Sequence, residues 1–171
     1  IQEIQYTTSG DSAETQSGGV RINMIPKEGG NSLRGTVFGN FTYDNWHSNN
    51  LDQRLIDRGL QSVGKIKQIW DFNPSIGGPI LRDRLWFHYT MRNWGVNRTV
   101  PGSFSEFDLD RPSIDDSYIN SNLLRLTWQI NNTHKLGAHY DRNHKYRGHW
   151  GLASNVSEEA AAIEDMPQSY N

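Results

Sequence analysis

Five segments of the chain alternate apolar with polar side chains, and this alternation restricts the possible folds more than any other feature. They are residues 33–44, 65–80, 85–96, 119–130 and 135–146. Successive side chains of a β-strand point to opposite faces of the sheet, so each segment predicts a long strand with one apolar and one polar face. Two shorter runs, residues 1–8 and 20–25, predict two further short strands.

The composition excludes several classes of protein. The formal net charge is −2, which argues against nucleic-acid binding, because neutralising phosphates needs a basic face. There is no cysteine, so disulfides and thiolate chemistry are excluded. No apolar stretch approaches the roughly 20 residues of a transmembrane helix. A transmembrane β-barrel remains possible, because its membrane-spanning segments are short and alternating.

Short and long connections alternate between the expected strands. Residues 81–84 and 131–134 predict tight turns, whereas residues 45–64, 97–118 and 147 onward predict long polar loops. This alternation is typical of outer-membrane barrels, in which short periplasmic turns oppose longer extracellular loops. The two tight turns would then lie on the periplasmic side.

Two short helices are expected in the long loops. Leu51, Leu55 and Leu60 recur at near-helical spacing, with Asn50 as a possible N-cap. Residues 157–165 begin with acidic side chains and continue with three alanines, which predicts a second, solvated helix.

Charged side chains on the expected polar faces are the candidates for facing the lumen of such a barrel. They are Arg34, Asp71, Arg92, Arg125 and Asp141. An anionic ligand is one possible partner for the arginines; ion pairs with Asp71, Asp141 or residues of a plug are another. Five strands cannot close a barrel, whose usual minimum is about eight, so we expect a fragment of a larger wall.

No catalytic or metal-binding pattern is evident. The chain lacks a nucleophile elbow, a phosphate loop and a zinc signature, so we expect neither enzymatic activity nor a cofactor. His134, His139, His144 and His149 are spaced by five, and an odd spacing sends successive strand side chains to opposite faces, which argues against a metal site. The acidic residues between 108 and 116 predict a surface loop, since the glycine of a calcium loop is missing.

Several blocks between Ala13 and Phe87 resemble TonB-dependent outer-membrane receptors. Residues 71–87 are especially similar to their Oar-like, carboxypeptidase-regulatory-like branch. Ala13-Glu14 and residues 17–31 (SGGVRINMIPKEGGN) resemble the end of the plug domain. Three further blocks resemble the first three barrel strands of these receptors: residues 33–39 (LRGTVFG), 71–80 (DFNPSIGGPI) and 82–87 (RDRLWF).

This resemblance implies an all-β fragment of a plugged barrel of about 22 strands. Residues 1–31 would be the C-terminal end of the plug, and residues 32–171 the N-terminal part of the barrel. It also implies residence in the outer membrane of a Gram-negative bacterium, contact with its lipid, and ligand uptake driven by the TonB energy-transducing complex through parts outside this chain. The ligand is unidentified.

Two alternatives remain open from the residues alone. One is a soluble, secreted β-sandwich binding module that uses its aromatic side chains as stacking platforms. The other keeps the receptor fold but serves adhesion or secretion, with the loops 45–64 and 97–118 as the working surface.

Overall fold

A computed structural model describes residues 3–7, 20–25, 27–48, 50–60 and 62–170. Ala13-Glu14 and residues 17–19 of the plug-like block lie outside these residues. The predicted strand 1–8 is described over residues 3–7.

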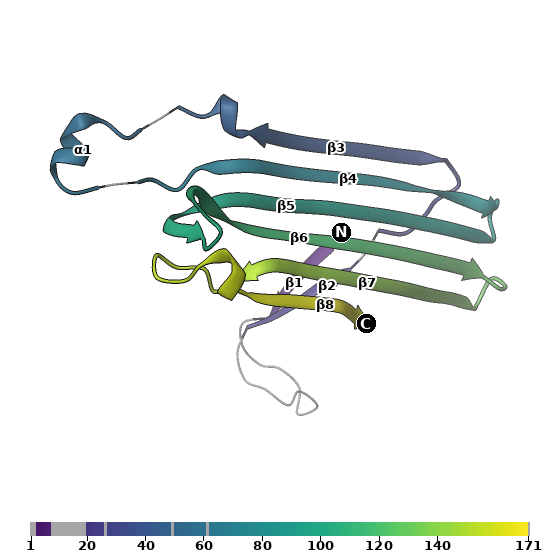
Figure 1. Cartoon of the computed structure of the whole chain (residues 1–171). Coiled ribbons are helices and arrows are strands. Elements are labelled where there is room, and N and C mark those ends of the chain that lie inside the picture. Colours follow the sequence, from purple (N-terminus) through teal and green to yellow (C-terminus); the bar gives the residue numbers. More distant parts are fainter. Residues whose placement is uncertain (1–2, 8–19, 26, 49, 61, 171) are drawn as a thin grey trace. The chain divides into compact units, whose positions relative to one another are not determined.

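The described residues form a mostly β structure, with one six-stranded sheet and one two-stranded sheet (Figure 1). The large sheet has the strand order β3-β4-β5-β6-β7-β8, and Figure 1 shows neighbouring strands running in opposite directions. Its strands are β3 (Arg34–Tyr43), β4 (Ile66–Leu81), β5 (Leu85–Ser105), β6 (Asp108–Gln129), β7 (Lys135–Trp150) and β8 (Ala162–Tyr170). Since β3 and β8 each have one neighbour, the sheet is not closed.

The small sheet pairs β1 (Glu3–Thr7) with β2 (Arg21–Ile25) in antiparallel register, from Glu3 opposite Ile25 to Thr7 opposite Arg21. Both short strands confirm the predictions made from residues 1–8 and 20–25.

All five long strands and both tight turns are confirmed, but the loop predicted over residues 97–118 is wrong. β5 continues to Ser105 and β6 begins at Asp108, so only Glu106 and Phe107 connect them. The buried side chains of this extension are polar rather than apolar: Thr99, Ser103, Ser105, Ser113 and Asp115. The alternation therefore persists without the hydrophobic contrast that reveals a strand in a sequence.

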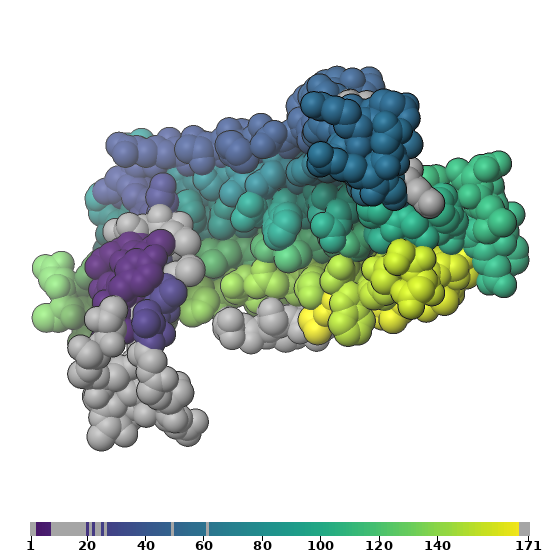
Figure 2. Space-filling model, turned by 90° about the vertical axis from the view of Figure 1, so that its left-hand side faces the viewer, coloured from purple at the N-terminus to yellow at the C-terminus, as the bar shows by residue number. Residues whose placement is uncertain are grey.

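The helix predicted in residues 45–64 is confirmed as α1 (Gln53–Asp57), which follows the 3₁₀ turn η1 (Asp44–Trp46). Its N-cap is Asp52 rather than Asn50, and the Asp52 carboxylate accepts a 3.0 Å hydrogen bond from the backbone N–H of Leu55. Figure 2 shows the blue residues around α1 gathered in one lobe. None of the helices in the described residues is long and apolar enough to cross a membrane.

The helix predicted over residues 157–165 is wrong. One 3₁₀ turn, η2 (Glu158–Ala160), is followed by β8, which pairs with β7 from Trp150 opposite Ala162 to Arg142 opposite Tyr170. The alanines favour a helix, but that preference is small beside the backbone hydrogen bonds offered by the free edge of β7.

Burial in this sheet is inverted relative to an ordinary globular domain. Among the described residues no hydrophobic side chain is buried, whereas Thr99, Ser103, Ser105, Ser113, Asp115 and Thr127 are. Exposed apolar side chains instead follow the predicted apolar faces of the strands: Val37, Phe41, Phe72, Ile76, Leu124, Leu126, Trp128, Leu136 and Tyr140. Exposed apolar side chains gathered on one face of a strand are typical of a surface that contacts a membrane or another protein.

The chain divides into two compact units. One comprises residues 1–35, 76–89 and 124–139, and the other residues 36–75, 90–123 and 140–171. The first holds the β1–β2 sheet and the tight turns, and the second holds α1 and the β5–β6 hairpin tip.

Candidate functional site

Of the five predicted polar-face residues, the structure joins Asp71 of β4 to Arg92 of β5. Arg92 donates from Nε to Oδ1 at 3.0 Å and from Nη2 to Oδ2 at 2.7 Å. Such a two-bond pair is among the stronger side-chain contacts, because the guanidinium fork matches the carboxylate. The guanidinium also lies 5.4 Å from the ring centroid of Trp94.

The other three predicted residues have different surroundings. Arg125 of β6 donates from Nη2 to Oε1 of Glu28 at 2.6 Å, and Asp141 of β7 accepts a 3.3 Å hydrogen bond from Asn143. Arg34 is exposed at the start of β3. The described contacts of Arg125 and Asp141 are thus with residues outside the predicted set.

Glu28 lies between two cations of the first unit. Its Oε2 accepts a 2.7 Å bond from Nζ of Lys135, beside the bond from Arg125 to Oε1. The hydrogen bond from Lys135 is the largest cause of a pKa of Glu28 below its ordinary 4.5; partial burial opposes that shift, and the positive charges of Lys135 and Arg125 add to it. The stabilisation from the contacts of Glu28 with Lys135 and Arg125 is therefore complete above pH 4.5, and it is lost as the pH falls through the lowered pKa of Glu28.

Asn31 fastens the same segment to the tight turn between β4 and β5. Its Oδ1 accepts from the backbone N–H of Asp83 at 3.0 Å and from Nε1 of Trp86 at 2.7 Å, while its Nδ2 donates to the Asp83 carboxylate. Asp83 has a φ of 63°, a left-handed conformation that asparagine and aspartate tolerate in turns. Glu28 and Asn31 lie within the block that resembles the end of a plug, and their sequence pattern does not predict these contacts.

Gly29, between these two residues, passes against the backbone of β5. A Cβ atom there would overlap the carbonyl oxygen of Phe87, whereas a Cβ at Gly30 would meet no atom within 4 Å. The segment Lys27–Asn31, which we call the junction segment, is therefore held by charge, by a capped turn and by close backbone approach.

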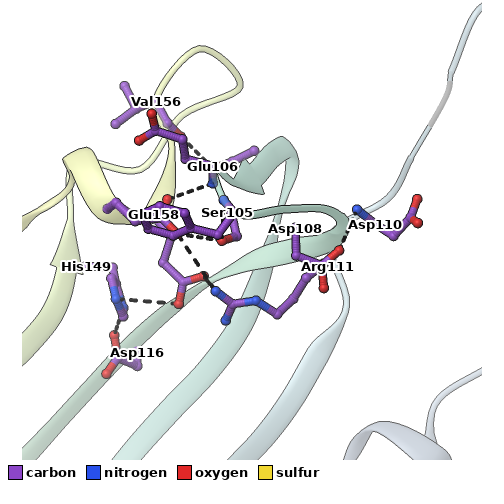
Figure 3. Close-up of polar contacts among 12 residues, drawn as sticks. Ser105, Glu106, Asp108, Asp110, Arg111, Asp116, His149, Val156 and Glu158 are labelled. Carbon is purple, nitrogen blue, oxygen red and sulfur yellow. Dashed lines mark hydrogen bonds and ion pairs between the residues drawn. The ribbon is translucent and has the colours of Figure 1, made fainter.

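A second polar cluster lies in the other unit, where the β5–β6 hairpin tip meets the connection from β7 to β8 (Figure 3). The Ser105 hydroxyl donates to Oε1 of Glu159 at 2.5 Å, and the backbone N–H of Glu106 donates to Oε2 at 2.8 Å. Arg111 pairs with Glu158 at 3.1 Å. These glutamates were predicted to lie on a solvated helix, and they instead tie two connections together.

His149 extends this cluster. Its Nδ1 lies 2.6 Å from Oδ1 of Asp116, and its Nε2 lies 3.5 Å from Oε1 of Glu158. Asp116 was predicted to lie in an acidic surface loop, but it belongs to β6 and faces β7. In the described part of the chain, no three histidine, aspartate or glutamate side chains gather as a metal site would require.

The hydrogen bonds from the hairpin tip fix the ionisation of Glu159. The backbone N–H of Glu106, and then the Ser105 hydroxyl, lower the pKa of Glu159 to about 2. Its carboxylate therefore stays ionised across the physiological range.

The fold and contacts define an all-β chain with an open antiparallel sheet, an exposed apolar face, and ion pairs on its polar side. Over 89 residues the chain is 32% identical to the TonB-dependent transporter Oar of Myxococcus xanthus. That alignment covers 51% of this chain and 8% of the relative, so the chain spans only a small part of the length of the relative that it matches. No family model and no solved structure matches the chain. The similarity indicates a relationship to TonB-dependent receptors.

The junction segment gives a test with neighbouring glycines. Gly29→Ala should destabilise the packing of the junction segment against β5 by about 1–3 kcal/mol, because the new methyl group would overlap the Phe87 carbonyl. Gly30→Ala is the matched control and should be neutral. Hydrogen exchange of the amides of residues 27–31 measures the difference, and equal protection in the two variants would contradict the proposed packing.

The hydrogen bonds from Ser105 and Glu106 to the Glu159 carboxylate, which we call the hairpin tie, lead to a prediction about pH. Because the folded pKa of Glu159 is depressed, the tie should hold from pH 8 to about pH 3 and weaken only near pH 2. Phe107 at the tip is 86% exposed, so cleavage after it reports loosening, with chymotrypsin at pH 8 and pepsin at pH 3. Glu159→Gln should speed cleavage at both pH values.

Glu106→Gln is the control for this experiment, since it makes the same chemical change yet keeps the backbone N–H that binds Glu159. Faster cleavage in both variants, or in neither, would show that the Glu159 carboxylate does not hold the tip.

Proposed function

We propose that this chain is part of a TonB-dependent outer-membrane receptor that takes up a ligand across the outer membrane of a Gram-negative bacterium. In this proposal β3 to β8 form the first part of the wall of a transmembrane barrel. Residues 1–31 are the C-terminal end of its plug, and the TonB energy-transducing complex acts through parts of the protein beyond this chain.

The observation that carries the proposal is the inverted burial of the sheet. Leu126 and Trp128 of β6 and Phe72 of β4 are exposed, while Thr127, between the two exposed residues of β6, is 2% exposed. Burying one large apolar side chain away from water contributes about 1.5–3 kcal/mol. A lipid surface would provide that burial for a whole face of the sheet at once.

The polar side of the strands supports the same proposal. Asp71 and Arg92 form a two-bond pair there, and Arg125 and Lys135 both reach Glu28 of the junction segment. Residues that resemble the end of a plug thus contact the polar side of the strands, as a plug inside a lumen would. A soluble sandwich would need a buried apolar layer, and no hydrophobic side chain of the described residues is buried.

The free edges of β3 and β8 fit a wall that continues in the rest of the protein. Unpaired backbone groups in lipid cost several kcal/mol each, so only closed barrels of strands span a membrane. The matched relative is far longer than this chain and is named a transporter, which favours further strands and uptake over an isolated module.

Two leucines of β6 provide the test. Leu126 lies on the apolar face, whereas Leu123, three positions earlier, lies on the polar face. In the full-length protein, Leu126→Lys should hinder assembly into the outer membrane, because a lysine facing lipid near the midplane costs about 2–4 kcal/mol. Leu123→Lys makes the same change toward the lumen and should assemble normally.

The amount of folded protein in purified outer membranes measures both variants. Equal assembly of Leu126→Lys and Leu123→Lys would contradict a lipid-facing surface on β6.

A further inference from the structure

Two arginines, one from each strand beside β6, converge on one aspartate of β6 in the second unit. Arg98 of β5 donates from Nε and Nη2 to Oδ2 of Asp115 at 3.2 and 3.0 Å. Arg147 of β7 places its Nη2 3.4 and 3.3 Å from the two carboxylate oxygens. Asp115, on β6, is 7% exposed, so it lies beneath the two guanidinium groups.

This triad carries more positive charge than a structural ion pair needs. One guanidinium balances Asp115, and the second leaves a net charge of +1. Arg98 meets the carboxylate with two nitrogens, but Arg147 does so with one nitrogen and at longer distances. The Nη1 atoms of both arginines take no part in these bonds. Donors of Arg147 are therefore available to a second oxyanion.

The triad borders a hollow of about 510 Å³. This size falls within the range of small-molecule sites, about 300–1,000 Å³. Lys65 also borders the hollow, and of the described residues that line it Asp115 alone is acidic. The three cations and one anion give this surface a net charge of +2 at neutral pH.

Apart from Thr99, the remaining side chains that line the hollow are apolar. Trp150, Leu152, Val100 and Ile66 line it, and the Trp150 side chain is half exposed. An indole face of this kind packs against planar or apolar ligand bodies. Charged donors beside apolar side chains can bind a molecule that has both an anionic group and an apolar body.

We propose that this hollow binds a small organic oxyanion, a carboxylate or phosphate on a compact apolar body, through Arg147, Arg98 and Lys65. Asp115 lies beneath the two guanidinium groups and competes with the ligand for their donors. The inference rests on the proposed receptor function and names the ligand class for it. The guanidinium fork matches both carboxylate and phosphate, so the two share one recognition chemistry.

The test uses the full-length protein purified from outer membranes in detergent, with benzoate and phenyl phosphate as probes. Benzyl alcohol is the neutral probe of similar size. Isothermal titration should show saturable binding of at least one anion and none of the alcohol, and the preferred anion identifies the headgroup. Absence of saturable anion binding, or equal binding of the alcohol, would overturn the inference.

Three variants separate binding from architecture. Arg147→Gln should weaken anion binding about ten- to a hundredfold, the value of a charge-assisted hydrogen bond. Asp115→Asn should tighten it, because both guanidinium groups lose their competitor. Arg54→Gln in α1 makes the same charge change outside the hollow and should leave affinity unchanged.

A purely structural triad predicts another result, in which Asp115→Asn weakens binding as much as Arg147→Gln does, and that result would overturn the inference. If Asp115→Asn does not assemble, the comparison of Arg147→Gln with Arg54→Gln decides, and equal affinities overturn it. Failure of the unaltered protein to reside in the outer membrane would instead contradict the proposed receptor function.

Discussion

The rest of this structure depends on pairing between neighbouring strands, because no hydrophobic side chain among the described residues is buried. Backbone hydrogen bonds join β3 to β8 in sequential order, and the buried side chains of the described residues are hydroxyls and one aspartate. An ordinary domain buries its apolar face, and this one presents it outward. In the proposed receptor, a bilayer would cover that face and leave the strand order unchanged.

Within each unit, hydrogen bonds and ion pairs hold connecting segments in place, as apolar packing does in an ordinary domain. Glu28 and Asn31 hold the junction segment, and Gly29 lets its backbone approach β5. In the other unit, Glu159 fastens the β5–β6 tip through two hydrogen bonds. Charge-assisted hydrogen bonds of this kind are stronger where water is partly excluded. They can therefore stabilise a protein whose apolar side chains are exposed rather than packed in a core.

Strand positions were predictable from the sequence where the two faces differ in polarity, as in residues 85–96 and 119–130. The continuation of β5 and β6 was not, because its buried side chains, such as Thr99, Ser103 and Ser113, are polar rather than apolar. β8 was missed because its strand state depends on the free edge of β7, a partner that local propensity does not include. The pair of Asp71 with Arg92 was among the possibilities, but the convergence of Arg98 and Arg147 on Asp115 depends on cross-strand register.

The most direct test of the outward apolar face is a nitroxide scan along β6 in the membrane-embedded full-length protein. These 171 residues contain no cysteine, so single cysteines can be placed at positions 123–128 without interference from this chain. Collisions with oxygen, which concentrates in lipid, should be frequent at 124, 126 and 128 and rare at 123, 125 and 127. Collisions with a water-soluble nickel complex that are equally frequent at all six positions would contradict the account.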